Sequence, residues 1–397
     1  MNKILFVSDE CIYPANSGGR IVRFDRITSL AKNNEVHLLV VVKKSQIKEM
    51  NGCPLYDCCK SITVVPRENI VISLFKSLFI PFRVASKTGK KVRKAFDYIL
   101  QKHDINVIVF EEPCVAALGK NVEKPQIIDS DNVEFEALLS HSRSINNPLK
   151  KLAFYHEYKL MKKFESKIYN SNHIVGCTFI SPDDMKRYEE LFELSKKKRC
   201  ILINHGFRVK KTYSSEKEEN NIISFTASMD YLPNEIAAAW LATKVMPIVL
   251  KSNKDVKLLL VGKNPSQHLK ELSSENIIVV GRVDSVESYY ECSSIALVPI
   301  FSGGGVKIKL IEAASFNKIV MSTTFGLKGS MFNDSEVIVR DNHVDFANTI
   351  IDILKSKKQY EAYRKRCYDK FLAEYNLDSN MLKYQSFVES FAAIKRS

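Results

Sequence analysis

The chain has 397 residues, of which 45% are hydrophobic, and 59 lysines and arginines against 45 aspartates and glutamates give it a formal net charge of +14. This length favours two domains. Because the longest apolar candidate for a membrane span, Val71–Phe82, is broken by Lys76 and Pro81, and because the start of the chain lacks a signal-peptide cleavage site, we expect a cytoplasmic protein. The positive charge suits acidic partners. No zinc finger, aromatic-basic platform or recognition helix indicates a nucleic-acid partner, so we expect none. The nine cysteines lack the spacing of a zinc site, and we expect no metal.

The first half of the chain alternates short apolar runs with helical patterns. The runs are rich in Val, Ile and Leu, and short continuous apolar strands between helices are typical of a parallel sheet covered on both faces. Apolar spacing predicts a helix after the first run and another over 150–169. The predicted strands are Ile4–Ser8, Val36–Val42, Ile62–Val65, Val107–Phe110, Gln126–Asp129, Ile174–Cys177 and Ile201–Asn204.

A loop after the first predicted strand carries Gly18, Gly19 and Arg20. Two glycines let a backbone approach a diphosphate or an acceptor closely, and an arginine pairs well with phosphate. The alternative is a plain tight turn followed by a surface arginine. We favour a binding role, because this loop is expected to line a cleft between the two domains.

Basic residues gather in the segment 83–94, which holds six lysines and arginines. Such a run usually forms a solvated helix face. It would also suit docking on an anionic membrane surface, at about 1 kcal/mol per well-placed charge. Both interpretations stay open, so peripheral membrane contact through this segment is a hypothesis.

Residues 208–220 are polar and charged, which indicates a linker between domains. The alternation then resumes, so we expect an α/β protein in which 1–207 and 221–375 form two Rossmann-like domains facing each other across a cleft. A helix over 376–397 is expected to pack back toward the first domain. Predicted strands of the second half are Ile222–Ala227, Val256–Val261, Ile277–Val280, Ile295–Pro299, Ile319–Ser322 and Val337–Val339, and predicted helices are Asn234–Val249, Lys309–Phe316, Val344–Leu354 and Lys358–Tyr375.

The most informative stretch joins a predicted strand to a predicted helix near residue 305. Glycines at such a junction let backbone N–H groups approach a ligand, and the helix N-terminus carries partial positive charge. Lysines add formal charge for a phosphate, and a glutamate accepts hydrogen bonds from sugar hydroxyls. The alternative is a mobile turn with ordinary surface residues, and the spacing is not that of a P-loop. We expect a nucleotide-sugar site formed by Gly303, Gly304, Gly305, Lys307, Lys309 and Glu312.

The segment 303–329 resembles the C-terminal signature of GT-B glycosyltransferases, specifically the family 4-like enzymes. It carries Ile311-Glu312-Ala313-Ala314 on the helix and Ser322-Thr323-Thr324 after the next strand. Further similarities lie at 228–234 and 280–284, and looser ones lie at 14–19 and 204–206. The resemblance implies the GT-B fold and a retaining, metal-independent enzyme. It would take a sugar from a nucleotide-diphosphate donor in the second domain to a glycan or lipid-linked acceptor in the first, with no further cofactor.

The resemblance also implies roles for residues of the second domain. Glu312 matches the second glutamate of a paired motif that holds the ribose hydroxyls, while the first glutamate would fall at Gly304 and is absent. Preorganised donors and cations stabilise a leaving diphosphate, so Lys307 and Lys309 would replace a magnesium ion. The remaining donor-binding candidates are Asp230 and Asn234, which stand where relatives have Arg and Lys, and Arg282 and Val283 beside the nucleobase.

In the first domain, the segment 127–134 resembles one that many relatives write as Asp-x-His-Asn-x-Glu, with Asp131 at the histidine position. A carboxylate there would orient an acceptor hydroxyl or stabilise an oxocarbenium-like transition state, so Asp131 joins Lys309 and Glu312 as a catalytic candidate. One alternative is a helix N-cap formed by Asp131 or Asn132. Another is a metal-binding Asp-x-Asp over 129–131.

The leading hypothesis is therefore a glycosyltransferase that builds a cell-surface polysaccharide or glycolipid. Nucleotide-sugar 2-epimerases share the two-domain fold, but they need acid/base carboxylates and histidines around the donor sugar. A catalytically inactive partner of a glycosyltransferase is the third candidate, because Gly304 and Asp131 depart from the family pattern.

Overall fold

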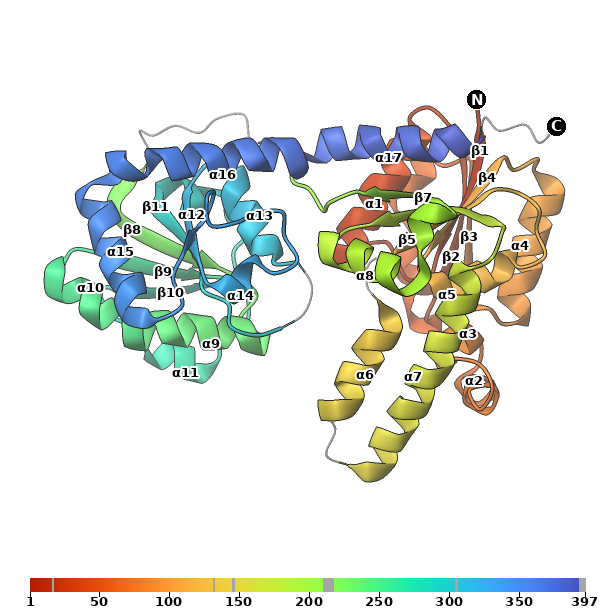
Figure 1. Cartoon of the computed structure of the whole chain (residues 1–397), viewed down its shortest axis with the longest axis horizontal. Coiled ribbons are helices and arrows are strands. Elements are labelled where there is room, and N and C mark those ends of the chain that lie inside the picture. The colour runs from red at the N-terminus through yellow and green to blue at the C-terminus, as the bar shows by residue number, and fades with distance from the viewer. Residues whose placement is uncertain (16–17, 131–132, 145–146, 210–217, 304–305, 393–397) are drawn as a thin grey trace. The chain divides into compact units, whose positions relative to one another are not determined.

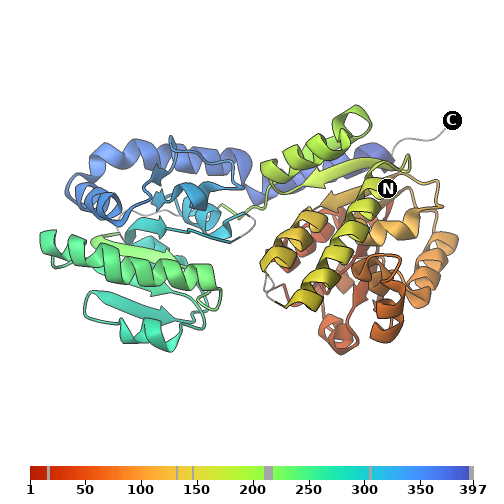
Figure 2. The same cartoon turned by 60° about the horizontal axis from the view of Figure 1, so that its bottom comes forward.

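Two separate parallel sheets form the framework of the computed structural model, which describes residues 1–15, 18–130, 133–144, 147–209, 218–303 and 306–392. The chain divides into unit 1, which comprises residues 1–204 and 379–397, and unit 2, which comprises residues 205–378. Each unit is an α/β layer structure, as Figures 1 and 2 show. The prediction of two Rossmann-like halves is thus confirmed.

Unit 1 is built on seven parallel strands in the order β3-β2-β1-β4-β5-β6-β7. All seven lie within two residues of the predicted bounds. The last strand ends two residues early, because the carbonyl of Asn204 accepts a hydrogen bond from Asn380 Nδ2 at 3.1 Å instead of continuing the ladder. The strands are β1 Lys3–Ser8, β2 Glu35–Val42, β3 Ser61–Pro66, β4 Val107–Glu111, β5 Gln126–Ser130, β6 Ile174–Phe179 and β7 Arg199–Leu202.

Helices lie on both sides of this sheet, and two of them, α6 and α7, run side by side away from it (Figures 1 and 2). Continuous apolar strands are buried from both faces in this arrangement, which is why they show no alternation. The helices of unit 1 are α1 Gly18–Ala31, α2 Ile70–Lys76, α3 Phe82–Lys87, α4 Lys90–Lys102, α5 Pro113–Ala116, α6 Glu134–Ser144, α7 Pro148–Tyr169, α8 Pro182–Phe192 and α17 Leu377–Ala392.

The C-terminal helix α17 completes the core of unit 1. Its Tyr384 is fully buried and donates a hydrogen bond to Asp129 Oδ2 at 2.6 Å. The aromatic rings of Phe387 and Phe391 pack directly on Gly176 of β6, where an added Cβ would lie 2.9 Å from Phe391. Distant parts of the sequence therefore form one core.

Unit 2 contains six parallel strands in the order β10-β9-β8-β11-β12-β13. The end of the predicted linker belongs to this sheet, because Ser294 Oγ holds the carbonyl of Asn220 at 2.9 Å and Glu219 pairs with β11. Residues 210–217 of that stretch lie outside the described residues. The strands are β8 Glu219–Thr226, β9 Lys257–Val261, β10 Ile277–Gly281, β11 Ser293–Val298, β12 Ile319–Ser322 and β13 Ile338–Val339.

The single helix predicted over 234–249 is in fact two helices joined by a π-helical turn, Leu241–Val245. Pro247 explains the break, because it cannot donate a backbone hydrogen bond to the preceding turn. The helices of unit 2 are α9 Leu232–Trp240, α10 Met246–Ser252, α11 Gln267–Glu271, α12 Glu287–Cys292, α13 Ile308–Ser315, α14 Thr324–Leu327, α15 His343–Lys355 and α16 Glu361–Glu374.

Each sheet has a point at which the direction of strand order reverses, between β1 and β4 in unit 1 and between β8 and β11 in unit 2. The loops after two such strands diverge and leave a crevice at the carboxyl edge, where ligands of open α/β sheets bind. A ligand site is therefore expected at these two edges. Within the described ranges, no helix combines the length and the apolar character that crossing a bilayer requires.

Candidate functional site

The loops that follow β8 and β11 meet at the carboxyl edge of unit 2. Gly303 has a φ of +105°, and a Cβ at this position would lie 2.5 Å from the hydroxyl of Tyr231. Only glycine suits such a conformation and such a close approach. Gly304 and Gly305 lie outside the described residues, so of the three predicted glycines the structure places only the first.

A hydrogen bond ties the start of α13 to the loop after β8. Lys309 Nζ donates to Asn234 Oδ1 at 2.7 Å, and Asn234 Nδ2 donates to the carbonyl of Ser228 at 2.7 Å. Asn234 is buried and is engaged at both ends of its amide. It therefore holds the Lys309 ammonium group in place, and its contact with a donor stays a prediction.

Positive charge accumulates where α13 begins. Lys307 is the buried N-cap residue of α13, and its Nζ lies 5.1 Å from the centroid of the Phe325 ring, which Lys328 approaches to 5.0 Å. Burial and the neighbouring Lys328 lower the pKa of Lys307. Burial and Lys307 lower the pKa of Lys309 to about 8, although Glu312 opposes the shift. The fold thus keeps ammonium groups together at an electrostatic cost.

Among the described residues, Lys309 forms no ion pair with a carboxylate. Perturbed groups of this kind cluster at functional sites, because a ligand supplies the opposite charge that the protein withholds. Two lysines and the N-terminus of an eight-residue helix would suit a diphosphate.

Glu312 lies one turn further along α13 and is half-buried. Its Oε2 accepts a hydrogen bond from the hydroxyl of Tyr290 at 3.3 Å, and the Tyr290 ring stacks on Phe316 with centroids 4.6 Å apart. Sequence reasoning missed Tyr290, whose only signal is its place on the helix after the predicted base-binding loop. It fixes the direction of the Glu312 carboxylate.

The other donor-site candidates lie along the same carboxyl edge. Asp230 is exposed, and its pKa is lowered by hydrogen bonds from Ser228 Oγ at 2.5 Å and Asn264 Nδ2 at 3.2 Å. Arg282 is exposed at the end of β10, and Val283 packs against a small apolar cluster under that end. Because β10 is two strands from β8, these two residues stand farther along the edge than Lys309 and Glu312.

Binding of a diphosphate is expected to weaken as pH rises through 8. The ammonium form of Lys309 attracts the ligand, and the pKa of this residue is about 8 in the free protein, so deprotonation removes the attraction above that pH. Bound anion raises the pKa, so binding near pH 8 takes up protons. Titration calorimetry in two buffers of different ionisation enthalpy measures this uptake. Proton release, or an affinity that is the same from pH 7 to pH 9, would contradict the expectation.

In unit 1 the predicted glycine loop is the beginning of a helix. Gly18 and Gly19 open α1, and an added Cβ on Gly19 would lie 2.9 Å from a guanidinium nitrogen of Arg23. Arg20 Nη1 contacts the carbonyls of Tyr13 and Pro14 at 3.3 Å each and Glu49 Oε2 at 3.2 Å. The Arg20 side chain therefore braces the preceding loop, which favours the structural alternative for this arginine.

A buried charged cluster at the carboxyl ends of β1 and β4 escaped the sequence analysis. Asp9 accepts from the Lys87 ammonium group and from Cys114 Sγ at 3.2 Å, and Glu111 pairs with Arg23. Burial would raise the pKa of Asp9, but Lys87 and Arg23 lower it. The cluster occupies the reversal point of this sheet and is a candidate acceptor-side site.

Half of the basic residues of the segment 83–94 are engaged inside unit 1, whereas Lys90, Lys91 and Lys94 are exposed. Besides the buried Lys87, Arg83 pairs with Glu134, and Arg93 Nη2 donates to the carbonyl of Ala117 at 3.0 Å. The segment therefore offers fewer charges to a membrane than its sequence suggests.

Asp131 lies outside the described residues, so neither its predicted catalytic role nor its N-cap alternative is placed. Asp129, two residues earlier, is fully buried. It accepts hydrogen bonds from Thr178 Oγ1 at 2.8 Å and Tyr384, and its Oδ2 lies 3.3 Å from Arg26 Nη1. These contacts use both carboxylate oxygens, which argues against the Asp-x-Asp metal motif.

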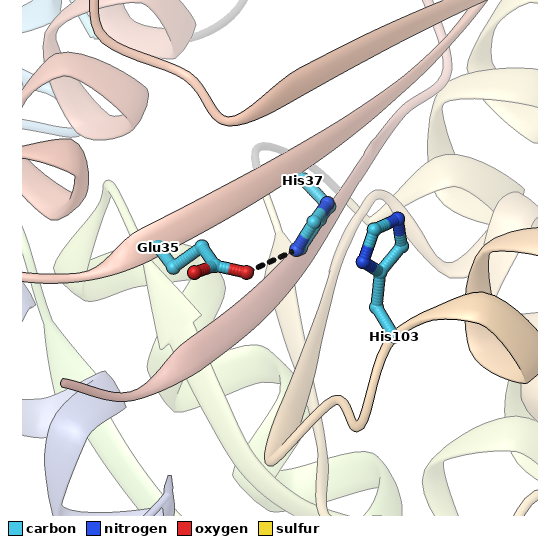
Figure 3. A group of neighbouring side chains, drawn as sticks. All are labelled: Glu35, His37 and His103. Atoms are coloured by element: carbon cyan, nitrogen blue, oxygen red, sulfur yellow. Dashed lines mark hydrogen bonds and ion pairs between the residues drawn. The ribbon is translucent and has the colours of Figure 1, made fainter.

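The described residues contain one group of metal-ligand type, Glu35, His37 and His103 (Figure 3). His37 Nε2 lies 3.0 Å from Glu35 Oε1, its Nδ1 lies 2.8 Å from Ser61 Oγ, and its ring is tilted by 31° to that of His103, with the ring centroids 3.9 Å apart. Both ring nitrogens of His37 therefore already have hydrogen-bond partners within unit 1. The group sits at the amino end of β2, and its geometry suits a hydrogen-bonded support.

Unit 2 carries a match to a known protein family, and nearly the whole chain is similar to a curated protein. Residues 220–356, all in unit 2, match the family model described as glycosyl transferases group 1. A curated Klebsiella pneumoniae protein, described as an uncharacterized 44.6 kDa protein in the cps region, is 28% identical over 372 residues, which are 90% of this chain and 92% of that protein.

Solved structures resemble the chain over nearly its whole length. Sucrose-phosphate synthase from Thermosynechococcus elongatus superposes with a TM-score of 0.64 at 16% identity, covering 99% of this chain and 100% of that one. HepE from Anabaena, solved in complex with UDP-glucose, superposes with a TM-score of 0.63 at 10% identity, covering 98% and 100%. At such low identities these structures show the fold. The solved structures therefore show the GT-B fold for the whole chain, and the match to the glycosyl transferases group 1 model is confined to residues 220–356 of unit 2.

Proposed function

We propose that the protein is a retaining glycosyltransferase of cell-surface polysaccharide synthesis. Unit 2 would hold a nucleoside-diphosphate sugar, and unit 1 would hold a glycan or lipid-linked acceptor. The observation that carries the proposal is the Lys307 and Lys309 pair at the start of α13, with Lys309 fixed by Asn234. Support for the donor class comes from HepE, which was solved with UDP-glucose, and support for the pathway comes from the cps-region relative.

The chemistry follows from where charge develops. When the bond between the sugar and the diphosphate breaks, negative charge grows on the leaving oxygen, and fixed cations in a buried site stabilise it most. Lys307 and Lys309 would supply this charge without a metal ion. Glu312, directed by Tyr290, would accept hydrogen bonds from ribose hydroxyls. Asp131 remains our candidate for orienting the acceptor or stabilising the oxocarbenium-like transition state.

Incubation with a panel of uridine, guanosine and adenosine diphosphate sugars tests the proposal. We expect one donor to yield free nucleoside diphosphate, and we expect Glu312→Ala to lower kcat/KM by about 100-fold, because the hydrogen bonds from the ribose hydroxyls to the carboxylate are lost. Glu271→Ala, on the exposed surface of α11, is the matched control and is expected to keep the wild-type rate.

Two outcomes would overturn the assignment. Interconversion of the donor sugar without nucleotide release marks the 2-epimerase alternative. If no nucleotide sugar reacts and calorimetry detects no binding of any nucleoside diphosphate, the inactive-partner alternative is favoured and the assignment of the donor site is wrong. We propose that the activity takes place in the cytoplasm, with the acceptor as its second substrate.

A further inference from the structure

A long apolar surface of unit 1 is left uncovered. It includes Phe75 and Phe79, which are 73% and 76% exposed on a segment that contains α2. Protein surfaces usually scatter such side chains singly, and a contiguous group marks an interaction site. The exposed apolar residues of this segment are Ile70, Val71, Ile72, Leu74, Phe75, Leu78, Phe79 and Ile80. We call it the apolar segment.

The helix α7 adds a second row of apolar side chains. Leu149, Leu152 and Tyr155 are exposed at intervals of three residues, so they lie along one side of the first turns of α7. Leu149 is 77% exposed. Figure 1 shows that this end of α7 points away from the sheet. An apolar helix end that projects in this way is positioned to enter an apolar surface outside the protein rather than to pack in the core of unit 1.

The exposed charge of α7 is entirely positive. Its two glutamates are used inside the unit: Glu157 accepts a hydrogen bond from the backbone N–H of Phe82 at 2.8 Å, and Glu165 is buried with its pKa raised by burial. The exposed lysines of this helix are Lys150, Lys151, Lys159, Lys162, Lys163 and Lys167. We call them the lysine row.

The apolar segment and two members of the lysine row, Lys163 and Lys167, border one hollow. The backbone N–H of Phe82, two residues after the apolar segment, donates a hydrogen bond to Glu157 in the middle of α7. This bond keeps the end of the apolar segment close to α7. Beside it lies a hollow of 530 Å³, lined by Phe79, Leu160 and Phe164 together with Lys163 and Lys167. Apolar side chains and ammonium groups thus face the same space.

We propose that this surface docks unit 1 on an anionic lipid bilayer. Phenylalanine and leucine side chains would enter the acyl boundary, and the lysine row would meet lipid phosphates, which is the division of labour in interfacial helices. A second copy of the chain fits less well, because a two-fold interface would bring the lysine row near its own symmetry mate. The docking surface that we propose is formed by 70–80 with α7.

This inference is independent of the donor site in unit 2, so the two proposals fail separately. The test is flotation of the full chain with vesicles of phosphatidylcholine alone and with about 30% phosphatidylglycerol. We expect binding to the anionic vesicles that decreases with salt. Phe75→Asp with Phe79→Asp is expected to weaken it at least tenfold. Lys163→Glu with Lys167→Glu is expected to weaken it at least about 25-fold, since one lysine near such a surface contributes about fivefold.

The control is Leu382→Asp, which changes a leucine on α17 that is equally exposed but lies outside this surface. It should bind as the wild type does, and all variants should keep wild-type circular dichroism and donor turnover. Absence of wild-type binding to anionic vesicles, or full binding by the double aspartate variant, overturns the proposal. A dimer that the aspartate substitutions dissociate would identify a second copy as the occupant instead and would overturn it as well.

Discussion

Lys309→Met is expected to lower kcat/KM for the donor by about 100- to 1,000-fold, or about 2.7–4 kcal/mol. Methionine keeps the length and the apolar stem of lysine but removes the charge that faces the leaving diphosphate. The fold should survive, because the cost of burying the Lys309 ammonium group and the benefit of its hydrogen bond to Asn234 are lost together. Steady-state kinetics and thermal unfolding, measured on the same preparation, separate the two effects.

Unit 2 offers a matched control in Lys318. Burial lowers the pKa of this lysine to about 8 as well, but Lys318 precedes β12 at the amino edge of the sheet and contacts Glu218 Oε2 at 3.4 Å. Lys318→Met should therefore lower stability and leave kcat/KM unchanged. If the two variants lose activity equally, buried lysines matter to this fold only as structural groups, and the assignment of Lys309 to the diphosphate is wrong.

Asp129→Ala is expected to destabilise unit 1 by about 3–5 kcal/mol, the usual cost of removing one member of a buried ion pair. The buried Arg26 would lose its carboxylate, and Thr178 and Tyr384 would lose their common acceptor. Urea unfolding followed by circular dichroism measures the loss. Fluorescence of Trp240, the single tryptophan, reports on unit 2 and shows whether the two units unfold together.

Two further variants distinguish a charge effect from a packing effect at Asp129. Tyr384→Phe removes one hydrogen bond to a charged group and should cost about 1.5–3 kcal/mol. Arg26→Met combined with Asp129→Leu removes both charges, so it should cost less than the two single substitutions added together. A simple sum would mean that Arg26 and Asp129 are not coupled.

The strands were predictable because burial on both faces makes each of them a continuous apolar run. Lys257–Val261 and Ile319–Ser322, for example, appear at or next to their predicted bounds. The 234–249 helix was predicted as one piece because its apolar spacing continues through Pro247, whereas the missing N–H divides it. Periodicity finds the element, and backbone chemistry decides where it ends.

The donor-site candidates were found because glycines and lysines at a strand-to-helix junction have few structural uses. The contacts between them were not predictable, since the Lys309–Asn234 bond joins residues 75 positions apart. The Asp9 cluster was missed for a similar reason: Lys87 stood in a run of basic residues that looked solvated, and its partner Asp9 is 78 positions away. Sequence shows where charge is, but not whether the fold turns it inward.

The return of α17 to unit 1 has a consequence for synthesis of the protein on the ribosome. Tyr384, Phe387 and Phe391 fill places in a core whose other members emerge nearly two hundred residues earlier, so that core stays open while unit 2 is being translated. Nascent chains would then expose apolar surface for most of their elongation and depend on chaperones for that time. A stop codon that removes only the last turns of α17 would release a polypeptide in which every residue of the donor site is present and the first unit remains unfinished.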